Sequence, residues 1–191
     1  MVGAMAKITE DIDNDDLIQR ARTDADALGR LYELYYDRIF RFCVYRLFNK
    51  ETAEDVTSMV FLEVARRIRT FVGRTEEDFR NWLYAIAVNQ ANAYIRKRSR
   101  REQLLKKAVS SMRGSDEAGD SADLDWPTLY QAILKLKPEH QTIVTLRFFE
   151  QLSFEQIGQI INAREATVRV TLHRILDKLR NHLQTAFKGE T

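Results

Sequence analysis

A dense run of positive charge near the middle of the chain is the first candidate for chemistry. Residues 96–101 read Arg-Lys-Arg-Ser-Arg-Arg, and Lys106 and Lys107 follow closely. One or two cations would be enough to complement the dipole at the end of a helix. A run this dense instead favours contact with a polyanion such as a nucleic acid.

Aromatic residues precede this basic run: Phe71, Phe79, Trp82, Tyr84 and Tyr94. Flat side chains can stack on unpaired bases. Large aromatics are usually buried, so for Phe79 and Trp82 core packing is the better interpretation. We expect Tyr84 and Tyr94 to be more open.

A second candidate lies near the C-terminus, where residues 153–180 have the pattern of a helix-turn-helix. Ser153 and Gln156 form a capping-box pattern at the start of a short helix, and residues 161–165 are long enough only for a tight turn. The apolar stripe of the following helix should leave several polar side chains facing solvent: Arg164, Arg169, Thr171, His173 and Arg174. Such a helix fits the major groove, where arginine can donate two hydrogen bonds to guanine. Spacing alone does not separate this interpretation from a solvated surface helix.

Enzymatic chemistry is not indicated anywhere in the sequence. The three histidines, His140, His173 and His182, have no ligand partners at metal-binding spacing, and no glycine-rich phosphate loop or GxSxG motif occurs. Cys43 is the single cysteine, so neither an intrachain disulfide nor a cysteine-based zinc site can form. It lies in an apolar pattern and is expected to be a buried thiol. We therefore predict no catalytic residue, no metal and no cofactor.

Composition favours a helical protein. Hydrophobic residues make up 45% of the chain and charged residues 30%, while only 7 glycines and 2 prolines interrupt it. An all-α fold is therefore expected. The sequence has neither an apolar run long enough to span a membrane nor the apolar core of a signal peptide, so we expect a cytoplasmic protein without membrane contact.

Two helical domains that position these candidate sites are predicted, at residues 1–107 and 126–191. In the first, apolar periodicity indicates helices near 14–22, from 26 onward, near 51–71 and near 79–98, with a loop at 72–78. Residues 108–125 are rich in serine, glycine and acidic side chains, which is typical of a flexible linker. Fully extended, such a linker reaches about 60 Å, which would let the two domains bind distant parts of one large object.

Three segments, taken in order, resemble sigma factors of the sigma-70 family. AEDVTSMVFLEV (residues 53–64) is similar to region 2.2, and FRNWLYAIAVNQANAYIRKRSRR (residues 79–101) to regions 2.3 and 2.4. Residues 136–180 resemble region 4. The absence of a third domain between them resembles the extracytoplasmic-function (ECF) group. The resemblance implies a four-helix region 2 domain and a helix-turn-helix region 4 domain.

The resemblance also implies a role for each segment. It implies that region 2 binds the clamp helices of the largest subunit of core RNA polymerase, through Asp55, Met59 and Phe61. The loop at 72–78 would take up flipped bases of the minus-ten promoter element, and the DNA contacts there would be Asn81, Asn89, Tyr94, Arg96, Lys97 and Arg98. Region 4 would bind the flap of the second large subunit and read the minus-thirty-five element through Arg169, Val170, Thr171, His173 and Arg174, with Arg164 beside them. An anti-sigma protein is a further implied partner.

Some positions depart from the family pattern. Met59 stands where an acidic residue is frequent, and Arg164 stands where a capping serine is common. Val170 and Thr171 replace a frequent Ser and Arg, and their methyl groups could contact a thymine methyl. We therefore expect an unusual minus-thirty-five sequence.

Two other functions fit parts of the sequence. A stand-alone helix-turn-helix regulator would touch DNA only through its second domain, and would have no need for the basic cluster at Arg96–Arg101. An inactive relative could instead act as a protein-interaction adaptor. The sigma factor interpretation is the one that uses both basic segments to direct RNA polymerase to promoters and open the minus-ten region.

Overall fold

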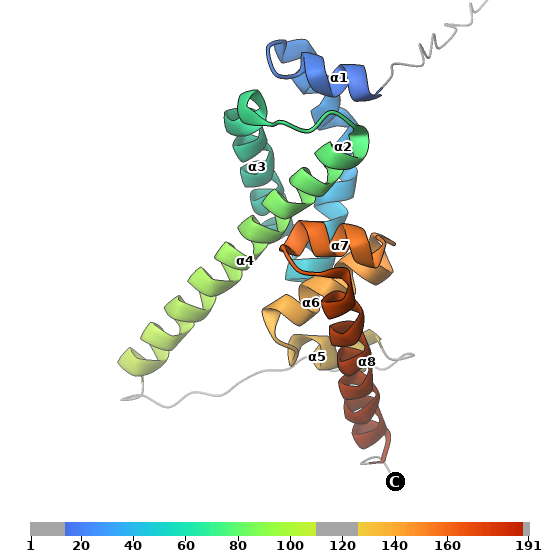
Figure 1. Ribbon diagram of the computed structural model, residues 1–191. Coiled ribbons are helices and arrows are strands. Elements are labelled where there is room, and N and C mark those ends of the chain that lie inside the picture. The colour runs from blue at the N-terminus through green and yellow to red at the C-terminus, as the bar shows by residue number, and fades with distance from the viewer. Residues whose placement is uncertain (1–13, 110–125, 189–191) are drawn as a thin grey trace, which may run out of the picture.

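The computed structural model describes residues 14–109 and 126–188, and within these two ranges every regular element is a helix (Figure 1). The first half contains α1 (Asn14–Arg20), α2 (Ala25–Leu47), α3 (Lys50–Arg67), the 3-10 turn η1 (Ile68–Thr70) and α4 (Glu76–Val109). The second half contains α5 (Trp126–Leu134), α6 (Pro138–Val144), the π-helical turn η2 (Thr145–Phe149), α7 (Phe154–Ile161) and α8 (Glu165–Lys188). The predicted all-α fold is confirmed.

The helices of the first half begin where side chains can cap them. Asp24 accepts a hydrogen bond from the backbone N–H of Asp26 at the start of α2, and Asn49 accepts one from Thr52 at the start of α3. Thr75 and Asp78 exchange hydrogen bonds across the first turn of α4. This capping starts α4 three residues earlier than the apolar periodicity indicated, so the loop that joins η1 to α4 is only residues 71–75.

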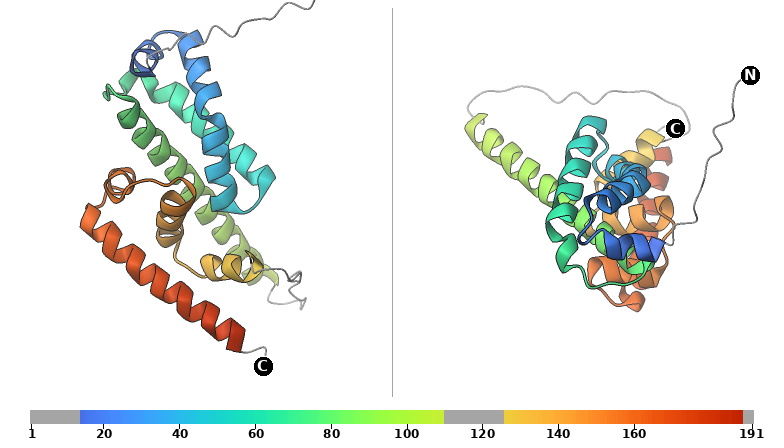
Figure 2. Two further views of the ribbon diagram at one scale, coloured as in Figure 1. Left: turned by 90° about the vertical axis from the view of Figure 1, so that its right-hand side faces the viewer. Right: turned by 90° about the horizontal axis from the view of Figure 1, so that it is seen from above.

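The second half contains the predicted helix-turn-helix. Pro138 begins α6, and Ser153 and Gln156 form the predicted capping box at the start of α7. After α7, Asn162 adopts the left-handed conformation at φ 55° and turns the chain into α8. A side chain at Gly158 would lie 2.6 Å from the carbonyl oxygen of Ala163, so this turn requires a glycine there. Figure 2 shows the long helix α8 beside the shorter helices of its half.

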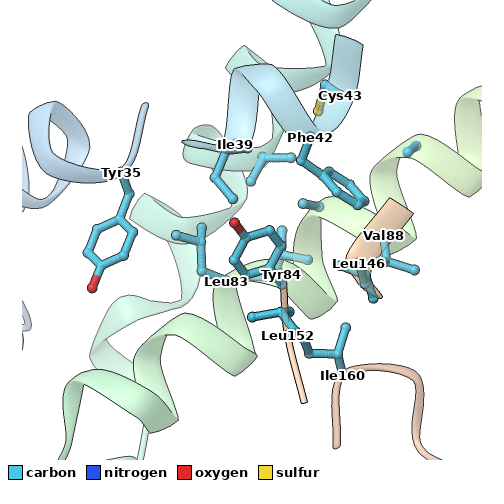
Figure 3. Packing of buried hydrophobic residues seen from close by; sticks show 14 of the residues in the cluster. Tyr35, Ile39, Phe42, Cys43, Leu83, Tyr84, Val88, Leu146, Leu152 and Ile160 are labelled. Atoms are coloured by element: carbon cyan, nitrogen blue, oxygen red, sulfur yellow. The ribbon is translucent and has the colours of Figure 1, made fainter. Parts of the chain in front are cut away.

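The two halves lie against one another and share a core. Figure 3 shows Leu146, Leu152 and Ile160 of the second half beside Tyr84 and Val88 of α4, and all five are buried. We call this surface the contact between the halves. The basic run of α4 is not covered by it, because residues 96–101 are exposed on the part of the helix that extends away from the bundle (Figure 1).

The predicted linker lies largely outside the described residues. Helix α4 continues to Val109, two residues into the range assigned to the linker, and residues 110–125 are not described. The closeness of the halves was not expected from their predicted separate tethering. Its physical basis is the packing of buried apolar side chains of η2 and α7 against α2 and α4.

Candidate nucleic-acid interface

The six residues predicted to contact the minus-ten element all lie on α4, but they do not share one face. At about 100° per residue, helical geometry puts Asn81, Asn89 and Arg96 within one side of the helix. Tyr94, Lys97 and Arg98 lie on other sides. Asn89 and the three basic residues among the six are exposed, whereas Asn81 is buried and Tyr94 is half-buried.

A hollow of about 610 Å³ between α3 and α4 brings two predicted sites together. Asp55 and Met59, predicted to bind polymerase, line it together with Tyr94, Lys97 and Arg98, predicted to bind DNA. The hydroxyl of Tyr94 is 3.3 Å from that of Thr52 on α3, which fixes the ring at the edge of the hollow. Met59 is 40% exposed, so an incoming apolar group can reach it. The hollow therefore combines an acidic, an apolar and several basic side chains on one surface.

Phe61 lies elsewhere. Its ring packs against α2, with its centroid 4.8 Å from that of Tyr32 and 6.2 Å from that of Tyr36. Of the three residues predicted to bind polymerase, the structure brings together Asp55 and Met59 but not Phe61.

The contact between the halves covers one predicted DNA contact. Asn81 is 8% exposed, and its side-chain amide donates a 2.6 Å hydrogen bond to Oε1 of Gln159 on α7. The side-chain amide of Gln156, also on α7, donates to Oε1 of Glu77 beside it. In this arrangement, DNA cannot reach Asn81 unless α7 moves away.

The aromatic residues are more buried than expected. Phe79 is 1% exposed, as predicted, but Tyr84 is 2% exposed, so the expectation of an open Tyr84 is wrong. Its ring packs edge-on against Phe42, and its hydroxyl donates to Oε2 of Glu150 in the second half. Burial raises the pKa of Tyr84 and also that of Glu150. The sequence could not reveal this, because the second half provides the cover.

The loop at residues 71–75 presents an apolar side chain to solvent. Val72 is 88% exposed, the most open of the large hydrophobic side chains in the described residues, although Phe71 next to it is buried. Gly73 follows, and a side chain there would collide with the ring of Phe71 and with Cβ of Asp78. The loop is thus packed on its inner side and open at Val72.

The second basic surface is the outer face of α8. This helix is the second one of the helix-turn-helix, the position that is named the recognition helix in this motif. Val168, Leu172, Ile175 and Leu179 are buried against the rest of the half. Arg169, Val170, His173 and Arg174 are exposed on the opposite face, and Thr171 is half-buried at its border. Arg164 is exposed in the turn before the helix. The apolar stripe therefore leaves these predicted side chains accessible, as expected.

Phe154 belongs to this surface, although no sequence motif indicated it. The guanidinium of Arg169 lies over its ring at 5.0 Å from the centroid, and that of Arg147 lies at 4.8 Å. Arg169 also forms an ion pair with Glu165 one turn earlier. These contacts hold the Arg169 side chain near the turn of the helix-turn-helix. No spacing rule links residues 147, 154 and 169, so only the fold reveals their proximity.

Comparisons with known proteins show the family of the chain. A family model described as Sigma-70 region 2 matches residues 31–101, and one described as Sigma-70, region 4 matches residues 132–181. The ECF RNA polymerase sigma factor SigW of Bacillus subtilis is 30% identical over 179 residues, which cover 87% of this chain and 94% of SigW. The chain belongs to the ECF sigma factors of the sigma-70 family.

Two further relatives extend the comparison for this sigma factor. The ECF RNA polymerase sigma factor BldN of Streptomyces coelicolor is 34% identical over 86% of the chain, which spans only 63% of the length of BldN. A solved structure of the sigma factor RpoE with the anti-sigma factor NepR from Bartonella quintana matches with a TM-score of 0.62. It covers 82% of this chain and 96% of RpoE at 18% identity, so this likeness shows the fold.

The contact between the halves of this sigma factor contains a buried arginine that no sequence motif indicated. Arg46 of α2 is 2% exposed. It donates hydrogen bonds to Oε1 of Gln141 (2.8 Å), the carbonyl of Pro138 (3.0 Å) and Oδ1 of Asn92 (2.9 Å). Burial lowers the pKa of Arg46 to about 10, so the side chain stays charged at neutral pH. Two of these three partners belong to the second half of the chain.

No membrane-crossing helix occurs in the described part of this sigma factor. Cys43 is buried, as predicted, and burial raises the pKa of its thiol to about 11.

Proposed function

We propose that this chain directs core RNA polymerase to specific promoters and helps to open the minus-ten region. The observation that carries this proposal is the presence of two separate basic surfaces, on α4 and on α8, in a chain that belongs to the sigma-70 family. A stand-alone helix-turn-helix regulator needs only the second of these surfaces and is not favoured. The sigma-70 family is not a family of enzymes, and the chain is proposed to make no covalent chemistry.

The minus-ten element is proposed to bind along α4 and the loop at 71–75. Flipping a base out of a duplex costs a few kcal/mol, and a protein without ATP chemistry can offset this only by binding the open form. The exposed Val72 of the loop offers an apolar surface to an unstacked base. On α4, Asn89 and Arg96 offer polar contacts. Asn81 joins them once α7 has moved away.

Core polymerase is proposed to bind at the hollow between α3 and α4 and at the second half. Asp55 and Met59 in the hollow would meet the clamp helices of the largest subunit. Because Tyr94, Lys97 and Arg98 line the same hollow, we propose that these three bind at the border between polymerase and DNA rather than to DNA alone. The second half would also bind the flap of the second large subunit.

The minus-thirty-five element is proposed to be read by the recognition helix. Arg169, His173 and Arg174 can donate to base edges or phosphates, and Val170, which is 50% exposed, can contact a thymine methyl. Arg164 is exposed in the turn before the helix, where it can contact a phosphate.

An anti-sigma protein is proposed as a regulator, because the related RpoE was solved in complex with the anti-sigma factor NepR. The same surfaces that bind polymerase would be those to cover.

The deciding experiment mixes the purified chain with core RNA polymerase and a promoter selected from a random library, and maps unpaired thymines with permanganate. Thymines reactive around the minus-ten position, only when both proteins are present, are expected. Sequence-specific duplex binding by the chain alone would favour the regulator, and polymerase binding without promoter opening would favour the adaptor.

A further inference from the structure

Helix α1 and the turn after it lie against the loop that joins η1 to α4, at one end of the first half (Figure 1). This helix is outside the range matched by the Sigma-70 region 2 model, which begins at residue 31. Its own residues Leu17 and Ile18 are buried, so the helix is firmly seated.

Side chains from α1 and its turn hold the backbone carbonyls of the loop. The side-chain amide of Gln19 donates to the carbonyl oxygens of Gly73 (3.3 Å) and Arg74 (3.2 Å). The guanidinium of Arg22 donates to the same Gly73 oxygen and lies 5.7 Å from the centroid of the Phe71 ring. The carbonyls of the loop are therefore turned toward α1.

A second set of bonds fixes the point at which the loop enters α4. Asp15 accepts from the backbone N–H of Glu76, and the side-chain amide of Asn14 donates to Oε2 of Glu76 at 3.0 Å. The hydroxyl of Tyr35 donates to the other oxygen of Glu76 at 2.9 Å. Both carboxylate oxygens of Glu76 thus face the protein, and the hydrogen bonds lower the pKa of Glu76.

The geometry points to a role for α1 in base capture: we propose that Gln19 and Arg22 are positioning residues that hold the loop in the shape that accepts an unpaired base of the minus-ten element. This inference rests on the proposed function, because it assumes that the loop meets such a base. With its carbonyls bonded to α1 and its inner side filled by Phe71 and Asp78, the loop can present Val72 outward. A loop that is already ordered loses less conformational entropy when a base binds.

The test uses variants of Gln19 in the full-length chain bound to core polymerase. Gln19→Ala removes the donor. Gln19→Glu keeps the length of the side chain but turns an oxygen toward two carbonyl oxygens, so it should impair base capture more than Gln19→Ala. If Gln19 only filled space, the glutamate variant would be the milder of the two. Arg22→Ala should also impair capture, and Arg22→Lys should restore part of it because lysine keeps a cationic donor.

The readout is the fluorescence of 2-aminopurine placed at each minus-ten position of a promoter, which rises when the base leaves the stack. Gln19→Ala and Arg22→Ala are each expected to reduce base capture about tenfold, as the loss of one or two hydrogen bonds implies. The matched control is Arg20→Ala on the same helix, since in the described structure Arg20 forms ion pairs with Asp16 and Asp24 rather than bonds to the loop. Binding to core polymerase should be equal for all variants.

Hydrogen exchange of the free chain gives a second measurement that does not depend on DNA. The backbone amides of residues 72–76 should exchange faster in Gln19→Ala and Arg22→Ala than in Arg20→Ala, with the exchange of α3 unchanged. A wild-type protein that opens no promoter would overturn both this inference and the proposed function. A wild-type protein that opens promoters, together with a Gln19→Glu variant that captures bases equally well, would overturn only the role of α1.

Discussion

On the recognition helix, Arg169 is held before any DNA arrives. Its guanidinium lies over the ring of Phe154 and pairs with the carboxylate of Glu165. A side chain that is already positioned loses less rotamer freedom when it binds a base, so these neighbours favour specific over diffuse contact. Nε2 of His173 lies 3.6 Å from Oδ2 of Asp177, one turn further along the helix.

Replacing Arg169 with alanine tests whether this residue reads sequence. We expect Arg169→Ala to weaken binding of polymerase to a cognate promoter by about 1–3 kcal/mol and to relax the base preference at one minus-thirty-five position. The measurement is promoter affinity across a set of single-base variants. Arg180→Ala, further along the same helix, serves as the control. An equal loss on every sequence would mean that Arg169 contacts only phosphate.

The turn between α7 and α8 positions the recognition helix and therefore Arg169. Gly158 allows the carbonyl of Ala163 to approach α7, and Asn162 supplies the left-handed residue. Close backbone packing at Gly158 therefore helps to set the angle between the two helices.

Gly158→Ala should strain this turn. The added methyl would lie 2.6 Å from a backbone oxygen, and such overpacking typically costs about 1–3 kcal/mol, partly offset by the better helix propensity of alanine, about 1 kcal/mol. The free energy of unfolding, measured in urea, and the affinity for the promoter should both decrease. Gly29→Ala on α2 is the matched control, because its new methyl would meet nothing within 4 Å; it should raise stability slightly.

The basic end of α4 is a second element with a measurable role. Reversing Lys97 and Arg98 to glutamate should impair promoter binding and reduce its dependence on salt, since fewer counterions are released. Arg66→Glu and Arg67→Glu on α3 change the net charge equally and are the control. If the hollow serves polymerase alone, the reversal will weaken core binding while leaving the salt dependence unchanged.

Local signals explain which of these elements could be predicted from sequence. The capping box at Ser153, Pro138 at the start of α6 and the four-residue steps of Val56, Val60 and Val64 all act within one or two turns of helix. The hydrogen bonds of Arg46 and Asn81 instead join residues 46 to 95 positions apart. No periodicity encodes such pairs, so the burial of Tyr84 and the cover over Asn81 could be found only from the folded chain.

The contact between the halves decides which surfaces of the chain are available to partners. It includes Arg46 and its hydrogen bonds, the stacked rings of Tyr45 and Phe149 with centroids 4.1 Å apart, and the bond from Tyr84 to Glu150. Promoter opening as proposed requires the halves to separate far enough to expose Asn81.

Arg46→Met should favour separation. It leaves Oε1 of the buried Gln141 without the donor it now uses, at about 1–3 kcal/mol while that group stays unpaired, and it also removes the donor to the half-buried Asn92. Fluorescent labels at exposed Leu62 and Leu176, each replaced by cysteine, should report a longer and broader distance than in the wild type. Cys43 is buried and should not be labelled. An unchanged distance would mean that apolar packing alone holds the halves together.

Glu150 should make this contact sensitive to acid. Burial raises the pKa of Glu150 in the closed arrangement, although the Tyr84 hydrogen bond and Arg41 act in the opposite direction. A group whose pKa is raised favours the closed form when protonated, and that contribution is lost as pH rises through the raised pKa. The halves should therefore close more tightly as the pH falls from neutral toward the ordinary glutamate value of 4.5.

Glu150→Gln mimics the protonated carboxyl and provides the comparison. The variant should be more closed than the wild type at neutral pH, and its label distance should change less with pH. A wild type and a variant with the same pH profile would show that another group, such as His140, governs the response.

Leu146, Leu152 and Ile160 are buried between the halves, so separation of the halves exposes them. When the halves part, these hydrocarbon side chains and their counterparts on α4 meet water, which is unfavourable. Without a partner, the chain should populate mainly the closed form, which is inactive in promoter opening. A partner protein that covers these exposed apolar side chains would stabilise the open form. Binding of that protein should therefore precede binding of DNA.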